Sequence, residues 1–366
     1  MKHYHTEKRL GRFIEVDGRQ LLHFSGTSYL GMGALPEFRK LVSEGAEIFG
    51  PCHGSSRHSN VRLGIYDRFE QYFAKQAAAE KALVFSSGYM AGSAAVQTIA
   101  PTADLIMAAP DSHPAILPIG YRHDPLGDFS SWADQVIHEC HIRKNAHILL
   151  LANAVNPLIP EVHDFHWIDK LSRSNRYTLV IDDSHAFGVI GNAAFGSYSK
   201  WQHLPVDLLI AGSMAKALAL PGGILLGNHF LLGKIEQHVI FRSSSPPAPG
   251  PLHAFLEGQD LYLKQHVHLK ENIKYIYEKI KNSLGFRMHP DYPVISFLNE
   301  RWVDALEKKG IILSSFSYPS PDAPSVNRLV LSAHHRKEDL DYLLVNLEKV
   351  VSQDGESNTP PSQKFT

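Results

Sequence analysis

The sequence predicts an α/β protein with a large domain, built on a mostly parallel sheet with helices on both faces, and a smaller C-terminal α+β domain. Short apolar runs alternate with helical patterns between residues 82 and 227. These runs are continuous, which indicates strands buried on both faces. The chain has 366 residues, more than one simple core requires, and its 44% hydrophobic and 20% charged residues are typical of a globular enzyme.

The first 250 residues are predicted to hold an arm and the large domain. The arm covers residues 1–35 and has an extended piece near "LLHFSG". In the large domain, residues 36–250, the pattern predicts helices at 36–49, 65–78, 88–100 and 165–175. It predicts strands at 82–87, 104–110, 147–153, 177–183, 207–213 and 223–227.

The remaining chain is predicted to continue with one long connecting helix over residues 251–284. A small domain follows at 285–351, with strands near 294–298, 310–316 and 328–333 and helices near 301–309 and 336–351. The polar tail, 352–366, is expected to be disordered.

Charge and composition argue against several classes of function. A net charge of −1 gives no reason to expect a nucleic acid or an anionic membrane as a partner. The two cysteines, Cys52 and Cys140, form no CxxC pair, so no metal site is predicted, and isolated cysteines suit a reducing compartment. The N-terminus has no apolar signal core and no run is long enough to span a bilayer, so we expect a cytoplasmic protein.

Three residues near strand ends suggest chemistry. Asp182 and Asp183 end the strand "YTLVIDD", and Lys216 follows the strand at 207–213 among small and apolar residues. Open parallel sheets bind ligands at the carboxyl ends of their strands. A carboxylate and an amine there fit pyridoxal 5'-phosphate (PLP), whose aldehyde binds an amine and whose ring nitrogen stays protonated beside a carboxylate. The alternative is a capping or salt-bridged aspartate and a lysine that extends to solvent.

The motifs around these residues decide between the two interpretations. The segments "DDSHAFGVIG" and "GSMAKALALPGG" resemble those of the α-oxoamine synthase family of fold-type-I PLP enzymes. Six further segments resemble family motifs in the same order, over roughly residues 20–350: "GTSYLGM", "HGSSRHSN", "LVFSSGYMAG", "YRHDPLGDF", "FRSSSPPAP" and "RLVLSAHHRKEDLDYLL".

The resemblance implies roles for the residues near the cofactor ring. Lys216 would bind PLP and then move protons at the substrate's α-carbon, and Asp182 would pair with the ring nitrogen. Asp183 is the less suitable partner because adjacent strand residues face opposite sides. His113 would stack on the ring, and His185 would contact the phenolic oxygen or the incoming acyl group. A turn histidine and a capping or core histidine, respectively, are the alternatives.

The resemblance also implies ligands for the phosphate and the substrate. The Gly88 and Tyr89 N–H groups and the Ser213 hydroxyl would bind phosphate. Ser243 would reach the phosphate of a partner subunit, which requires a homodimer; otherwise it belongs to a plain Ser/Pro loop. Arg328 would clamp the carboxylate of the amino acid, and its alternative is a surface arginine.

The chain departs from the family pattern at four places. Ser28 replaces an asparagine near the substrate, and Ala219 replaces a glycine after the lysine. The "E-G-x-x-S-M-D-G-D" segment is replaced by residues 152–162, where Asn156 stands roughly at the position of a serine that bonds the phenolic oxygen. The N-terminal arm, which helps bind coenzyme A in the family, is short.

The resemblance predicts an acyltransferase that condenses an amino acid with an acyl thioester, carried by coenzyme A or a carrier protein, to an α-oxoamine. Compact length favours the member that uses alanine and a pimeloyl thioester. Another fold-type-I PLP enzyme (an aminotransferase, aldolase or lyase) and a non-catalytic scaffold subunit are the alternatives. The retained Lys216 and Asp182 argue against the scaffold.

Overall fold

The computed structural model describes residues 2–125, 127–283, 285–318 and 322–357. Within this part of the chain it divides into two compact units. The larger unit comprises Ser28–Pro157 and Glu161–His266, and the smaller unit takes the described residues of Met1–Thr27, Leu158–Pro160 and Val267–Thr366. Residues 358–366 of the predicted disordered tail lie outside the described residues.

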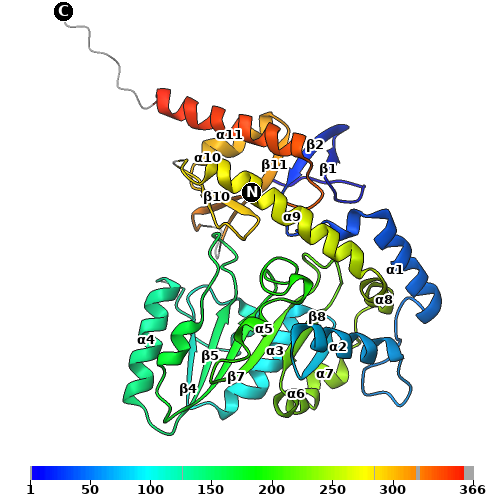
Figure 1. The fold of residues 1–366 in the computed structure, drawn as a ribbon, viewed down its shortest axis with the longest axis vertical. Helices are drawn as coiled ribbons and strands as arrows, with labels where there is room; N and C mark the ends of the chain where they lie inside the picture. Colours follow the sequence, from blue (N-terminus) through cyan, green and yellow to red (C-terminus); the bar gives the residue numbers. More distant parts are fainter. Residues whose placement is uncertain (1, 126, 284, 319–321, 358–366) are drawn as a thin grey trace, which may run out of the picture. The chain divides into compact units, whose positions relative to one another are not determined.

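The larger unit is built on a sheet with the strand order β3-β8-β7-β6-β5-β4 (Figure 1). Its strands are β3 (Lys81–Phe85), β4 (Leu105–Ala108), β5 (His147–Asn153), β6 (Arg176–Asp182), β7 (Asp207–Ser213) and β8 (Gly223–Gly227). Neighbours from β7 to β4 are parallel, and β8 is antiparallel to both β7 and β3. The prediction of a mostly parallel sheet is therefore confirmed.

Helices cover both faces of this sheet, as predicted. On one face α3 packs on an apolar cluster that includes Leu209 and Ala211 of β7. A side chain at the next residue, Gly212, would instead meet Phe187 on the opposite face. Phe187 packs edge-on against Phe73 of α2. Because successive strand residues point to opposite faces, α3 and α2 lie on different sides of the sheet.

The helices of the larger unit follow from local signals. They are α1 (Pro36–Phe49), α2 (Gly64–Ala77), α3 (Gly88–Ile99), α4 (Phe129–Ile142), α5 (Tyr198–Trp201), α6 (His229–Glu236), α7 (Val239–Ser243) and α8 (Pro249–Glu257), and α9 (Gln259–Ile280) begins in this unit. Ser87, Asp128 and Asn228 accept backbone N–H groups as N-caps of α3, α4 and α6.

Two helix predictions were wrong. The predicted long helix at 251–284 is two helices, α8 and α9, with Gly258 between them. The helix predicted at 165–175 is a short 3₁₀ helix, His166–Lys170. After it, Leu171 has an extended backbone, and Asn175 bonds the backbone of Ala146 and Cys140 with its side chain.

The smaller unit is a sheet with helices α10 (Glu300–Lys308) and α11 (Lys337–Ser357). Its strand order is β1-β2-β11-β12-β10-β9. The strands are β1 (Phe13–Val16), β2 (Arg19–Phe24), β9 (Arg287–Met288), β10 (Val294–Phe297), β11 (Ile311–Ser317) and β12 (Ser325–Val330).

The ends of two elements in the smaller unit differ from the prediction. Strand β12 begins three residues before Arg328, so this arginine lies inside the strand and does not open it. Helix α11 continues to Ser357, which makes the start of the predicted tail helical. The segment predicted as an arm supplies β1 and β2, and β2 pairs in parallel with β11. Among the described residues we find no helix with the length and apolar character needed to cross a membrane.

Candidate functional site

The parallel strands of the larger unit bring the predicted residues to one edge of the sheet. Asn153, Asp182 and Ala211 are register partners in β5, β6 and β7. Asp182 is the last residue of β6, and Lys216 follows the end of β7 by three residues. The carboxyl end of β3, which leads into α3, lies at the same edge because β3 and β7 run parallel. This is the edge at which open α/β sheets bind ligands.

His113 is held above the end of β5 by a residue that the sequence analysis did not single out. Its N–H group donates to the side-chain oxygen of Asn153 at 3.1 Å, and Asn153 donates in turn to the carbonyl of Asp111. The His113 ring lies with Nδ1 3.9 Å from Asp182 Oδ2. Asn153 and Asp182 are register partners on neighbouring strands. The hydrogen bond from the His113 backbone to Asn153 therefore places the His113 ring beside Asp182.

The pKa of His113 shows that Lys216 belongs to the same group of residues. Burial lowers this pKa most, the charge of Asp182 opposes that effect, and the charge of Lys216 adds to it. The charges of Asp182 and Lys216 both act on His113, with opposite effects on its pKa. The lowered pKa favours the neutral ring, which suits stacking on a flat cofactor better than a charged, strongly hydrated one.

The two neighbouring aspartates face different environments. The Asp183 carboxylate accepts two hydrogen bonds from Ser197, one from its N–H group at 2.6 Å and one from its hydroxyl at 2.8 Å. Asp183 is completely buried. Burial raises its pKa to about 7, against the hydrogen bonds from Ser197, and the charge of Asp182 raises it further. Asp182 instead points to the side of His113. The structure therefore places the two carboxylates on opposite sides, as the alternation of strand residues predicts.

Ser184 joins Asp182 to Ser213. Its N–H group donates to Asp182 Oδ1 at 2.8 Å, and its hydroxyl accepts the N–H group of Ser213 at 2.8 Å. The sequence analysis quotes this serine as part of the motif "DDSHAFGVIG" but gives it no role. The contact joins the loop after β6 to the last residue of β7, 29 residues away, so a single sequence contains no local signal for it.

The start of α3 packs directly against Ser213. A Cβ atom on Gly88 would lie 2.4 Å from the Ser213 nitrogen, so only glycine allows this approach. Among the described residues, no hydrogen-bond partner of the Gly88 and Tyr89 N–H groups is found; Ser87 caps the N–H group of Met90. Free N–H groups at a helix start and a nearby serine hydroxyl are the donors that a phosphate group needs.

These residues fit PLP. At one end of this cluster of residues, the start of α3 offers hydrogen-bond donors for a phosphate. At the other end lies the carboxylate of Asp182, whose side chain is only 7% exposed. A buried carboxylate suits a protonated ring nitrogen, and Lys216 would supply the amine for the aldehyde.

His185 has a buried partner that the sequence analysis missed. The Tyr29 hydroxyl lies 2.8 Å from His185 Nδ1, and Tyr29 is completely buried. Tyr29 stands in the motif "GTSYLGM", directly after the predicted Ser28, which is exposed. This motif is the signal in the sequence that points to Tyr29. The sequence analysis considered only Ser28, the residue of the motif that differs from the family pattern.

The loop that carries Lys216 has one unusual backbone conformation. Ala219 adopts a φ of 55°, in the left-handed region that favours glycine. This is the position where the family pattern has glycine. The loop thus keeps the glycine-like conformation with an alanine.

The other predicted residues lie in different surroundings. Asn156 lies in a turn whose flanks pair as a Val155–Val162 bridge, and its N–H group donates to the Glu161 carbonyl at 2.9 Å. Ser243 ends α7 and is exposed, in a hollow of about 350 Å³ together with Arg242 and two serines of the loop before α2. In the smaller unit, Arg328 is buried in β12 with its guanidinium 5.2 Å from the centre of the Phe316 ring.

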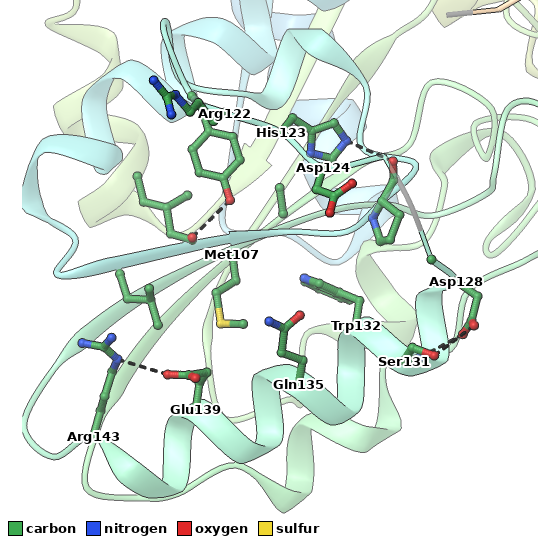
Figure 2. A pocket seen from close by; sticks show the side chains of 16 residues that line it. Met107, Arg122, His123, Asp124, Asp128, Ser131, Trp132, Gln135, Glu139 and Arg143 are labelled. Atoms are coloured by element: carbon green, nitrogen blue, oxygen red, sulfur yellow. Dashed lines mark hydrogen bonds and ion pairs between the residues drawn. The ribbon is translucent and has the colours of Figure 1, made fainter. Parts of the chain in front are cut away.

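A hollow of about 510 Å³ lies at the β4 edge of the large sheet, and no predicted site residue lines it. Figure 2 shows Trp132, Gln135 and Glu139 of α4 lining this hollow together with Met107 of β4. The motif "YRHDPLGDF" crosses the edge here: Tyr121 donates to the Ile106 carbonyl and His123 bonds the Pro110 carbonyl. The motif thus covers an edge strand, which otherwise presents unpaired backbone groups.

Comparisons with known proteins identify the family and the fold of this chain. The model of the family "Aminotransferase class I and II" matches residues 27–347. The 8-amino-7-oxononanoate synthase of Thermoanaerobacter pseudethanolicus is 25% identical over 362 residues, covering 92% of this chain and 89% of its own length. The enzyme of that name from Thermosipho melanesiensis is 26% identical, covering 94% of this chain and 92% of its own length.

Solved structures show the same fold. Serine palmitoyltransferase of Sphingomonas wittichii superposes with a TM-score of 0.83 at 18% identity, over 96% of this chain and 92% of its own. The 8-amino-7-oxononanoate synthase of Francisella tularensis superposes with a TM-score of 0.69 at 20% identity, over 91% and 98%. The predicted fold type is confirmed.

Proposed function

Because the chain belongs to the aminotransferase class I and II family, we propose that it is a PLP-dependent C-acyltransferase of the α-oxoamine synthase type. It joins an amino acid to an acyl thioester, with release of the thiol and of carbon dioxide. The observation that carries the proposal is the convergence of His113, Asp182 and Lys216 at one sheet edge beside the start of α3.

The bound PLP supplies an electron sink for the carbanion of the amino acid. Lys216 would hold the cofactor through its amine. Once the amino group of the substrate has taken its place on the aldehyde carbon, the freed Lys216 amine would take the proton from the α-carbon as general base. Asp182 keeps the proton on the ring nitrogen, since a buried carboxylate favours the charged partner. His113 covers the ring, and His185, oriented by Tyr29, contacts the phenolic oxygen or the acyl group.

The phosphate is bound by the Gly88 and Tyr89 N–H groups and by the Ser213 hydroxyl. We propose further that Ser243 completes the phosphate site of a partner subunit in a cytoplasmic homodimer. Asn156 bonds the phenolic oxygen, and Ser28 and Arg328 recognise the substrate, with the Arg328 guanidinium on the carboxylate.

For the substrates we propose alanine and a pimeloyl thioester, the pair of 8-amino-7-oxononanoate synthase in biotin synthesis. The names of the curated relatives support this choice. Two other substrate pairs are the alternatives: glycine with a short acyl chain, and serine with a palmitoyl chain. The fold match to serine palmitoyltransferase is a reason to include the serine pair in the test.

A thiol-release assay tests the reaction. Purified protein with PLP is mixed with alanine, glycine or serine and with pimeloyl, acetyl or palmitoyl thioesters of coenzyme A or carrier protein, and free thiol is followed. We expect release with alanine and the pimeloyl thioester, and a loss of the order of a thousandfold or more in Lys216→Ala. Formation of a keto acid without thiol would indicate an aminotransferase instead, and no release with any pair would overturn the proposal.

A further inference from the structure

Arg57 forms a buried ion pair that the proposed reaction does not use. Its side chain is 8% exposed, and it donates to Glu70 Oε1 at 2.7 Å and to Glu70 Oε2 at 2.9 Å. This is the bidentate geometry in which a guanidinium binds a carboxylate most firmly. A second acidic residue, Asp67, lies 3.3 Å away but is 54% exposed. Arg57 belongs to the motif "HGSSRHSN", to which the proposed function assigns no role.

Glu70 connects this pair to an edge strand of the large sheet. Its Oε1 atom also accepts the N–H group of Val84 at 2.7 Å. Val84 lies in β3, which pairs with β8 and forms one end of the strand order, so Glu70 caps an N–H group on its outer side. Burial raises the pKa of Glu70, while Arg57 and the Val84 N–H group lower it. This buried carboxylate therefore depends on these two partners for its charge.

The pair stands between two segments that the proposed function assigns to the phosphate. Val84 is followed within a few residues by Ser87, Gly88 and Tyr89 at the start of α3. On the other side, the Arg57 guanidinium lies 5.5 Å from the centre of the Phe241 ring in α7, the helix that ends at Ser243. Phe241 also packs edge-on against Phe85 of β3, at 5.3 Å between ring centres.

We propose that Arg57 and Glu70 act as a positioning pair that holds β3 and α7 in place, and so sets the geometry of both phosphate-binding segments without contacting the cofactor. This inference rests on the proposed function. Its consequence is specific: the pair should support affinity for the phosphate group and leave affinity for the rest of the cofactor unchanged.

The test compares PLP with pyridoxal, which lacks the phosphate. Dissociation constants of both are measured for wild-type apoprotein, Glu70→Gln, Arg57→Lys and the control Asp67→Asn. Glu70→Gln keeps an oxygen for Val84 but loses the charge, and Arg57→Lys keeps the charge but loses the fork. We expect the dissociation constant for PLP to rise about tenfold in both, with that for pyridoxal unchanged. Asp67→Asn should match the wild type, because its contact is exposed and longer.

The melting temperature of each apoprotein separates positioning from general stability. A merely structural pair would lower the melting temperature and weaken both ligands alike, and that result in both variants would overturn the inference. So would an unchanged preference for PLP over pyridoxal in Glu70→Gln and Arg57→Lys. If the wild type itself does not bind PLP, the proposed function fails first, and this inference with it.

Discussion

At the scale of single residues, two adjacent aspartates at the end of β6 have different surroundings. Asp182 and Asp183 are adjacent, yet Asp182 lies beside His113 and Asp183 is bound by Ser197. The alternation of a strand is enough to predict which carboxylate faces the site. It does not predict that the second carboxylate is fully buried, since that depends on a loop 14 residues further along the chain.

The buried carboxyl group of Asp183 should make folding sensitive to pH. Its pKa is about 7 in the folded protein, against an ordinary value of 3.8. Between these values the folded chain keeps a proton that the unfolded chain has lost, so this group destabilises the fold progressively as pH rises from about 4 to 7. A shift of about three units corresponds to roughly 4 kcal/mol. Above pH 7 the full cost is present.

Urea unfolding of wild type and Asp183→Asn at pH 5 and pH 8 measures this effect. The amide removes the titration, so the stability of the variant relative to wild type should rise by about 2 to 3 kcal/mol between the two pH values. The exposed Asp169→Asn is the matched control and should show no such change. Parallel pH curves for wild type and Asp183→Asn would contradict the expectation.

Contacts between residues distant in sequence explain what could not be predicted at the site. Lys216, Asp182 and Gly88 stand in motifs with a recognisable order. Asn153 and Tyr29 gain their importance from His113 and His185, which are 40 and 156 residues away. Only the fold brings the members of each pair together.

At the scale of elements, predictions succeeded where burial alone decides the structure. Strands β5 and β7 begin and end where the apolar runs predict, because both are covered on two faces. The break at Gly258 and the short 3₁₀ helix at His166–Lys170 were missed. Both are determined by side-chain and packing contacts, which compete with an otherwise helical pattern.

The start of α3 is the element on which phosphate binding depends. Ser87 accepts the Met90 N–H group at 3.2 Å and so holds the first turn, where Gly88 and Tyr89 present their N–H groups. Replacing it by alanine should lower the free energy of unfolding by about 1 kcal/mol, the usual cost of losing an N-cap. It should also weaken PLP binding, because the first turn frays.

A second N-cap provides the control for this prediction. Asp128 accepts the Ser131 N–H group at 2.8 Å at the start of α4, which carries no predicted site residue. Asp128→Ala should cost a similar free energy, measured by urea unfolding, with unchanged PLP affinity. Equal losses of PLP affinity in both variants would mean that the effect follows stability and not the position of the first turn.

At the scale of the whole molecule, the proposed homodimer makes the most demanding prediction. Ser243 is exposed at the end of α7, and the proposal assigns it to the partner's phosphate site. If so, each site uses Lys216 from one subunit and Ser243 from the other. We expect Ser243→Ala alone to weaken PLP binding about tenfold, the effect of losing one hydrogen bond to a charged group. Lys216→Ala alone should abolish covalent attachment.

Hybrid dimers formed from these two variants distinguish the arrangements. A hybrid has one subunit with Lys216 but alanine at position 243, and its partner supplies an intact Ser243. One of its two sites is therefore complete if Ser243 acts across the dimer, and wild-type PLP affinity should return in half of the sites. If Ser243 acts within its own subunit, no site is complete and affinity stays at the level of Ser243→Ala. Differently tagged subunits, purified as the hybrid and titrated with PLP, decide between the two arrangements. A monomeric wild type in solution would exclude the arrangement across the dimer.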